Sequence, residues 1–212
     1  LPVKYVMDIK YDGNRYQIHK HNQKILIFNR KGKIVTNQFT DIANLVRELD
    51  GNFILDAEIY PVDEHGNPAN HKLLAKRVHS NDKEKAIIEC PVRLAIFDIL
   101  MFMGVSLIEE PYEMRLNHLK GIPTKYLSYM YNRDHNGVMS DVSFQSAYNE
   151  AISDGFEGIM IKDLDAKYDV GRRSNSLLKH KPPRIELDVV ITSASYGEGK
   201  LSDVFSSFGI SI

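Results

Sequence analysis

The chain has 212 residues, is 43% hydrophobic and carries 27 basic and 28 acidic residues, which fits one or two globular domains with a sizeable core. No apolar run approaches the ~18 residues that a membrane helix needs, so we expect nothing to span a bilayer. The N-terminus shows no basic region followed by an apolar stretch, as a secretory signal would. The single cysteine, Cys90, excludes an internal disulfide and a cysteine zinc site.

The first sixty residues predict a strand-rich region with one helix. Short β-branched or aromatic runs, separated by residues typical of turns, predict strands at 3–9, 15–19, 24–28 and 53–60. Apolar residues at helical spacing predict a helix over 42–49, and a glycine follows it as a stop signal. His19 and His21 share one strand face with no acidic or cysteine partner, so we interpret them as structural rather than metal-binding.

The middle of the chain predicts helices around one buried strand. The continuous apolar run 92–102 is typical of a buried strand, and the polar stretch before it has helical character. Helices are predicted at 111–119 and at 143–153, and a serine cap begins the second of them. Two short strands, 159–161 and 177–180, flank a polar loop.

Two consecutive prolines, Pro182 and Pro183, interrupt the pattern, because proline lacks a backbone donor and restricts the residue before it. After them, 185–196 and 203–212 predict two strands joined by a glycine-rich turn, which lacks the spacing of a phosphate-binding loop. Two strands are too few for an independent domain. Since the chain also begins with Leu, we expect a piece of a longer protein that ends inside its second domain. The predicted fold class is α+β, rich in antiparallel sheet.

Charge is unevenly distributed along the chain. The windows 10–33 and 162–184 together hold 14 basic and 4 acidic residues, whereas the remainder holds 13 basic and 24 acidic residues. If the two windows meet in space, they form a basic surface suited to polyphosphate or to a nucleic-acid backbone. Two solvated faces without a partner explain the charge equally well.

Five stretches place lysines or acids beside apolar runs at predicted strand ends, where their side chains can converge on a cleft. They are Lys10-Tyr11-Asp12-Gly13-Asn14-Arg15, Leu55-Asp56-Ala57-Glu58, Ala95-Ile96-Phe97-Asp98, Glu157-Gly158-Ile159-Met160-Ile161-Lys162 and Leu178-Lys179-His180-Lys181. The first stretch alone is weak, because Lys-x-Asp-Gly arises by chance in about one such chain in twenty. The five together, in this order, are a specific pattern.

In order, spacing and content, these stretches resemble the nucleotidyltransferase motifs of ATP-dependent DNA ligases, which also occur in RNA ligases and mRNA capping enzymes. The resemblance implies a nucleotidyltransferase (adenylation) domain over 1–184 and the first strands of an incomplete OB-fold over 185–212. Asn29-Arg30 departs from the family's usual Ser-Arg. The last motif also differs, since His180 separates its two lysines.

The resemblance assigns roles to individual residues. It makes Lys10 the lysine that becomes covalently adenylated. It implies that Glu58 contacts the ribose or a metal ion, that Phe97 stacks on adenine, and that Glu157 supports metal binding. The remaining residues that it places at the nucleotide or at phosphates are Ile9, Arg15, Arg30, Lys162, Lys179 and Lys181, of which the last two hold the α-phosphate.

The residue types suit this chemistry without the resemblance. A lysine must be neutral to attack phosphorus, whereas its ordinary pKa of about 10.4 leaves it protonated near pH 7. Partial burial and neighbouring cations, such as Lys179 and Lys181, would lower the pKa of such a lysine. Magnesium prefers carboxylate and phosphate oxygens, which suits Glu58 and Glu157 around a triphosphate.

Simpler interpretations stay open for four of these residues. Phe97 also fits packing in a core, because it lies in an apolar run. Glu58 and Glu157 fit acids at strand ends on the surface, and Arg30 fits a solvated arginine. The sequence therefore leaves these assignments to the geometry of the fold.

The expected function is that of an ATP-dependent DNA ligase. In that reaction ATP adenylates Lys10 and releases pyrophosphate, AMP moves to the 5′-phosphate of a DNA nick, and the 3′-hydroxyl displaces AMP. ATP as AMP donor and Mg²⁺ are the expected cofactors, and nicked double-stranded DNA is the expected partner. An RNA ligase or an mRNA capping guanylyltransferase is the alternative within the class. A non-catalytic nucleic-acid-binding module is the alternative outside it.

The resemblance also implies a monomer that takes part in DNA replication, repair or recombination, with a sliding clamp as a candidate partner through regions outside this chain. The expected location is cytoplasmic and nucleoid-associated in a prokaryote or a virus-infected cell, and nuclear in a eukaryote. We expect the isolated chain to adenylate slowly and to seal nicks poorly.

Overall fold

The computed structural model describes residues 4–171, 176–183 and 187–211. The chain divides into two compact units, Leu1–Lys181 and Pro182–Ile212, and each unit is described by itself. Among the residues described, no helix is long and apolar enough to cross a membrane.

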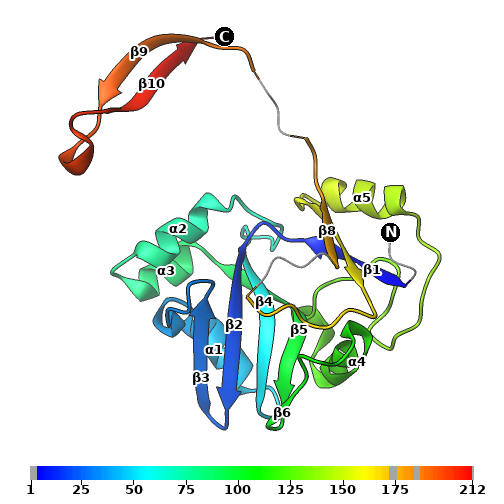
Figure 1. Cartoon of the computed structure of the whole chain (residues 1–212). Coiled ribbons are helices and arrows are strands. Elements are labelled where there is room, and N and C mark those ends of the chain that lie inside the picture. Colours follow the sequence, from blue (N-terminus) through cyan, green and yellow to red (C-terminus); the bar gives the residue numbers. More distant parts are fainter. Residues whose placement is uncertain (1–3, 172–175, 184–186, 212) are drawn as a thin grey trace. The chain divides into compact units, whose positions relative to one another are not determined.

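The larger sheet of the first unit is antiparallel and has five strands in the order β3-β2-β4-β5-β6 (Figure 1). Its strands are β2 (Asn14–His21), β3 (Lys24–Asn29), β4 (Phe53–Pro61), β5 (Val92–Phe102) and β6 (Val105–Ser106). Apart from short β6, these are the strands that β-branched and apolar runs predict. All neighbours in the sheet pair antiparallel, and short turns join β2 to β3 and β5 to β6.

The smaller sheet joins segments that are far apart in the sequence. Its strands, in the order β1-β7-β8, are β1 (Tyr5–Lys10), β7 (Gly158–Asp163) and β8 (Leu177–His180). β1 pairs antiparallel with β7, about 150 residues later, and not with β2, which follows it directly. The smaller sheet therefore brings the first, fourth and fifth of the charged stretches together.

The helices cover the outer faces of the two sheets (Figure 1). The α-helices are α1 (Thr40–Arg47), α2 (Lys72–His79), α3 (Lys83–Glu89), α4 (Tyr112–Asn117) and α5 (Phe144–Ser153). Single 3₁₀ turns are η1 (Thr36–Gln38), η2 (His118–Gly121), η3 (Thr124–Tyr126) and η4 (Gly199–Leu201). The predicted cap of α5 is confirmed, because the Ser143 hydroxyl accepts a hydrogen bond from the Ser146 N–H at 3.1 Å. The helix predicted over 111–119 is shorter, since α4 changes to the 3₁₀ turn η2.

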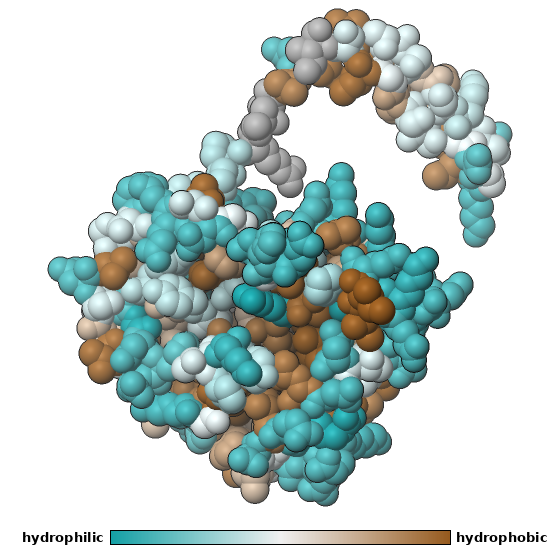
Figure 2. Space-filling model, turned by 180° about the vertical axis from the view of Figure 1, so that it is seen from behind, coloured by the Kyte–Doolittle hydropathy of each residue, from teal (hydrophilic) through white to brown (hydrophobic). Residues whose placement is uncertain are grey.

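Alternating burial along β2 and β3 separates a core face from an open face in this part of the larger sheet, whereas β4 and β5 are buried on both faces. On β2 and β3, Tyr16, Ile18, Ile25 and Ile27 are buried in the main hydrophobic cluster, which also includes residues of α1. The residues between them are mostly half-buried or exposed. A second cluster lies between the smaller sheet and α5. Seen from behind, the first unit is mostly hydrophilic around a central hydrophobic area (Figure 2).

The second unit contains a β-hairpin, β9 (Val190–Tyr196) and β10 (Phe205–Ser211). The two predicted strands and the turn between them are confirmed, but the first strand is shorter than the predicted 185–196. It begins at Val190, which pairs with Ser211, and 187–189 form no strand. Residues 184–186 lie outside the described part of the chain. The OB-fold assignment stays a prediction.

A fully buried arginine ties α2 to the segment that precedes β5. Arg77 is 1% exposed, donates hydrogen bonds to the carbonyl oxygens of Gln38 (3.1 Å) and Cys90 (2.7 Å), and pairs with Asp41. Its guanidinium carbon lies 5.0 Å from the centre of the Phe39 ring. The bond to the Cys90 carbonyl is buried and those to Gln38 and Asp41 are partly buried, so removal of this one side chain leaves three acceptors without their donor.

We expect Arg77→Met to lower the free energy of unfolding by about 3–5 kcal/mol, because it leaves a carboxylate and two carbonyls without their donor. Urea denaturation followed by circular dichroism measures the change. Lys85→Met is the matched control, since Lys85 is exposed in an exposed pair with Glu89 and should cost at most about 0.5 kcal/mol. Equal midpoints for the two variants would contradict this role of Arg77.

Candidate active site

Lys10 is the last residue of β1 and lies opposite Gly158 in β7. The Glu157 N–H donates to the Lys10 carbonyl at 3.1 Å, so the backbone places the glutamate beside the lysine. Gly158 has φ +140°, and a Cβ there would collide with the carbonyl oxygen of His180 in β8. Glycine is therefore needed where β1, β7 and β8 come closest.

Glu157 binds two lysines at once. Its Oε2 accepts a hydrogen bond from Lys10 Nζ, and its Oε1 accepts one from Lys181 Nζ at 3.0 Å. Burial acts to raise the pKa of Glu157, but the hydrogen bonds from the two lysines prevail and lower it. Glu157 is therefore a carboxylate at neutral pH, and it draws the last lysine of the fifth stretch towards Lys10.

Glu58 faces this group from β4 of the larger sheet, directly opposite Arg15 in β2. Within the described part of the chain, its carboxylate has no hydrogen-bond or ion-pair partner. Burial raises the pKa of Glu58 to about 8, and the charge of Asp56 adds to this, although Lys10 and Arg15 act to lower it. The side chain is thus an unpaired, half-buried acid that a cation or a hydroxyl group can satisfy.

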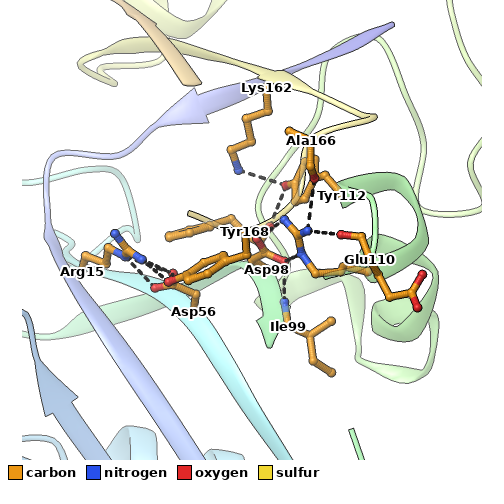
Figure 3. A network of polar contacts seen from close by, with 11 residues as sticks. Arg15, Asp56, Asp98, Ile99, Glu110, Tyr112, Lys162, Ala166 and Tyr168 are labelled. Carbon is orange, nitrogen blue, oxygen red and sulfur yellow. Dashed lines mark hydrogen bonds and ion pairs between the residues drawn. The ribbon is translucent and has the colours of Figure 1, made fainter. Parts of the chain in front are cut away.

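Arg15 is held in place by a buried acid. Its Nε donates to both oxygens of Asp56, at 2.8 and 3.0 Å, and Asp56 is fully buried (Figure 3). The Tyr168 hydroxyl, from the segment after β7, donates to Asp56 at 2.9 Å and accepts from Arg15. The hydrogen bonds to Asp56 raise the pKa of Arg15 further above its already high range. Arg15 is half exposed, so this rigid cation can still contact an anion.

Phe97 lies at an irregularity of β5 that turns it away from the core. Asp98 pairs with Asp56 and Ile96 pairs with Ala57, so Phe97 is the extra residue of a bulge. Ile96 is buried in the main cluster, whereas Phe97 is half-buried. The interpretation of Phe97 as a core residue is therefore wrong.

Lys162, from β7, lies with its Nζ 4.6 Å from the centre of the Phe97 ring. It pairs with Asp8. It also donates to the Tyr112 hydroxyl at 3.1 Å (Figure 3), and that hydroxyl donates to the Phe97 carbonyl at 2.7 Å. Burial acts to lower the pKa of Lys162, but its interactions with Asp8 and Tyr112 together outweigh burial and the pKa is raised. Lys162 is thus a buried, paired cation that fixes the aromatic ring.

Three of the predicted residues lie at the margin of this arrangement. Lys179 is exposed on β8, on the same face as Asp8 because both pair with Met160 across the sheet. Arg30 is exposed just after β3 and has no ion pair among the described residues. Ile9 is 7% exposed, and its side chain lies in the second cluster, so only its backbone can face a ligand.

Asp8, Tyr112 and Tyr168 are parts of the site that sequence reasoning missed. Asp8 had a signal, since a charged residue inside the apolar strand Val6–Ile9 must have a buried partner. The two tyrosines had none, because the charged groups that they contact, Lys162 and Asp56, are 50 and 112 residues away in the sequence.

The carboxylates fit a magnesium ion that is bound together with phosphates. The described residues contain no group of three or more His, Cys, Asp or Glu side chains that could hold a metal ion by itself. Magnesium needs only one or two carboxylates when phosphate oxygens and water complete its shell. Two carboxylates near Lys10 could bind the ion. Glu58 has no partner among the described residues, and Glu157 would exchange one of its lysines for the ion.

Comparison with known proteins covers almost the whole first unit. The family model described as an ATP dependent DNA ligase domain matches residues 2–181. DNA ligase 2 of Methanosarcina acetivorans is 31% identical over 207 residues, which are 95% of this chain and 36% of that protein. The DNA ligase of Acidianus ambivalens is 34% identical over 213 residues, 96% of this chain and 35% of that protein. The chain therefore spans little more than one third of these relatives.

Solved structures agree on the fold. The ligase domain of LigD from M. tuberculosis matches with a TM-score of 0.66 and 23% identity, over 84% of this chain and 54% of that one. The Chlorella virus DNA ligase-adenylate matches with a TM-score of 0.56 and 18% identity, over 97% of this chain and 74% of that one. The expected antiparallel nucleotidyltransferase fold is thereby confirmed. Because the five motifs occur in order, the fold agrees and the family model matches residues 2–181, the chain belongs to the ATP-dependent DNA ligase family.

Proposed function

We propose that this chain performs the nucleotidyl transfer of an ATP-dependent DNA ligase, with Lys10 as the nucleophile. The observation that carries the proposal is the meeting of Lys10, Glu157 and Lys181 at one end of the smaller sheet, with the unpaired Glu58 facing them. The Lys10 amine lies among acids and cations and is partly exposed, which suits attack on a polyphosphate.

In the first step the neutral amine of Lys10 forms a bond to the α-phosphorus of ATP, and the bond to pyrophosphate breaks. The Lys10 ammonium first loses one proton to solvent, a second proton leaves its nitrogen for solvent as the bond to phosphorus forms, and pyrophosphate leaves as the anion. In the second step the 5′-phosphate of a nick takes AMP from Lys10, and in the third the 3′-hydroxyl attacks that phosphate and releases AMP. Each step replaces one bond to phosphorus by another.

The charged side chains have distinct parts in this scheme. Lys181 and Lys179 stabilise the negative charge on the α-phosphate. To do so, Lys181 breaks its ion pair with Glu157. Arg15, fixed by Asp56, contacts phosphate without having to be ordered on binding. Phe97 offers one face of its ring to adenine, and Lys162 holds that ring in position. Arg30 contacts phosphate of the nucleotide or of DNA.

We propose that Glu58 and Glu157 hold Mg²⁺ when nucleotide binds. The ion would neutralise phosphate charge, which favours departure of pyrophosphate. Glu58 also suits a ribose hydroxyl, since its carboxylate lacks a partner among the described residues. Burial favours the protonated form of Glu58, and a magnesium ion or a hydroxyl donor would instead stabilise its carboxylate.

We further propose that the partner is nicked double-stranded DNA, that the protein acts as a monomer in replication, repair or recombination, and that a sliding clamp contacts parts of the protein outside this chain. These points rest on the resemblance to the ligase family. The cytoplasmic, nucleoid-associated or nuclear location rests on the same resemblance.

Lys10→Ala should abolish covalent attachment of AMP and leave the fold unchanged, because a side chain at the edge of a site contributes little packing. Intact-mass measurement after incubation with ATP and magnesium should show one adenylyl group on the wild type and none on the variant. Lys4→Ala is the control, since Lys4 is exposed just before β1. Equal labelling of Lys10→Ala and the wild type would remove Lys10 from this role.

The nucleotide that labels the protein distinguishes a ligase from a capping guanylyltransferase. We expect covalent labelling with radioactive ATP and little or none with GTP at the same concentration. Denaturing gels show the label, and Lys10→Ala gives the background. Labelling by GTP alone would contradict the DNA ligase assignment.

The raised pKa of Glu58 makes stability depend on pH. An acid with a pKa of about 8 in the folded protein favours the folded state below its ordinary pKa, and this advantage is lost as pH rises through 8. Glu58→Gln should therefore match the wild type at pH 5 and exceed it by about 2–4 kcal/mol at pH 9. Urea denaturation at both pH values measures the difference. Parallel stability curves would show that Glu58 titrates normally.

A further inference from the structure

The open face of the β2–β3 hairpin forms a continuous surface beside the candidate active site. Register pairs Gln17 with Phe28, His19 with Leu26 and His21 with Lys24, so these six side chains point to one side. We call this set the ribbon face. All six are half-buried or exposed, whereas the strand residues between them are buried and point into the core. Asn22 and Gln23, which form the turn between the two strands, are exposed.

The ribbon face lacks negative charge. The chain has no acidic residue from Gly13 to Thr40, while basic residues occur on β2, on β3 and in the turn that follows. One of them is not available, because Lys20 points inward and donates to the carbonyl oxygens of Arg47 (2.7 Å) and Leu49 at the end of α1. Lys24 and Arg30 are exposed and have no ion pair among the described residues. Such a face attracts a polyanion.

An aromatic contact lies in the middle of the ribbon face. The His19 and Phe28 rings lie 4.6 Å apart between centres. Burial lowers the pKa of His19, so its imidazole is neutral near pH 7. Together with half-buried Leu26, the two rings offer an uncharged surface between cationic ends. A sugar-phosphate backbone needs such a surface for its sugars and cations for its phosphates.

The ribbon face continues into the candidate active site. Arg15 precedes Gln17 and His19 on the same side of β2 and lies directly opposite Glu58. From Arg15 to His21 the strand runs for about 20 Å at ~3.3 Å per residue. That length corresponds to about six base pairs of duplex at 3.4 Å each.

We propose that the ribbon face binds the backbone of one strand of duplex DNA beside the nick, with Lys24 contacting a phosphate and His19 and Phe28 lying against sugars. This inference rests on the proposed function, in which these residues would hold the DNA substrate. Antiparallel sheets often leave one face to water. The absence of acids and the continuity with Arg15 distinguish this face from a merely solvated one.

Charge reversal tests the phosphate contact. Lys24→Glu should weaken binding of a fluorescent nicked duplex about tenfold at 50 mM salt and less at 200 mM, because one counterion-releasing contact is lost. The matched control is Lys85→Glu, which makes the same change of charge on exposed α3 and should bind like the wild type. His19→Ala/Phe28→Ala should weaken binding at both salt concentrations by similar factors, since it removes uncharged contacts.

Self-adenylation of the same samples, measured by intact mass without DNA, separates the two proposals. We expect all the variants to adenylate like the wild type, because none of these residues touches Lys10. Binding by Lys24→Glu equal to that by Lys85→Glu, with adenylation intact, would overturn the ribbon face alone. A wild type that does not adenylate would overturn the proposed function and the inference that rests on it.

Discussion

The pairing of β1 with β7 is the constraint on which the rest of the site depends. It places Lys10 opposite Gly158, so that Glu157, which precedes this glycine, lies beside the lysine amine. It also places Lys162 opposite Val6, on the same face of the sheet as Asp8. At the same point β8 can approach β7 only because residue 158 has no Cβ, which would collide with the carbonyl oxygen of His180. A shift of β1 by one residue would turn Lys10 and Asp8 to the face that packs on α5, away from Glu157 and Lys162.

The charges of the site are balanced in pairs that differ in their function. The acids of two pairs, Asp8 and Asp56, are buried, and they hold Lys162 beside the Phe97 ring and Arg15 at the edge of the site. The acid that pairs with Lys10 and Lys181, Glu157, is 25% exposed, so water and ligand can compete for it. Rigid pairs therefore surround exchangeable ones, which suits a site that must bind a polyphosphate and release it.

Sequence patterns predicted much of this arrangement. Alternating and apolar runs located the strands, the serine before 144 marked the start of α5, and five motifs pointed to Lys10, Glu58, Phe97, Glu157 and Lys162. Three kinds of feature did not follow. The partner of β1 depends on contacts across the whole unit, β9 is shorter than its β-rich sequence predicts, and Tyr112 and Tyr168 contact charged groups 50 or more residues away.

The sequence by itself determined the family and pointed to candidate residues for the chemistry, because motif content and order are local properties. Only the tertiary structure decided how these residues are used. A bulge in β5 turns Phe97 out of the core, the register of β4 against β2 sets Glu58 opposite Arg15, and burial among apolar strands leaves that acid with a pKa of about 8. Burial and the direction of a side chain depend on neighbours from distant segments, and the chain specifies those only when it folds.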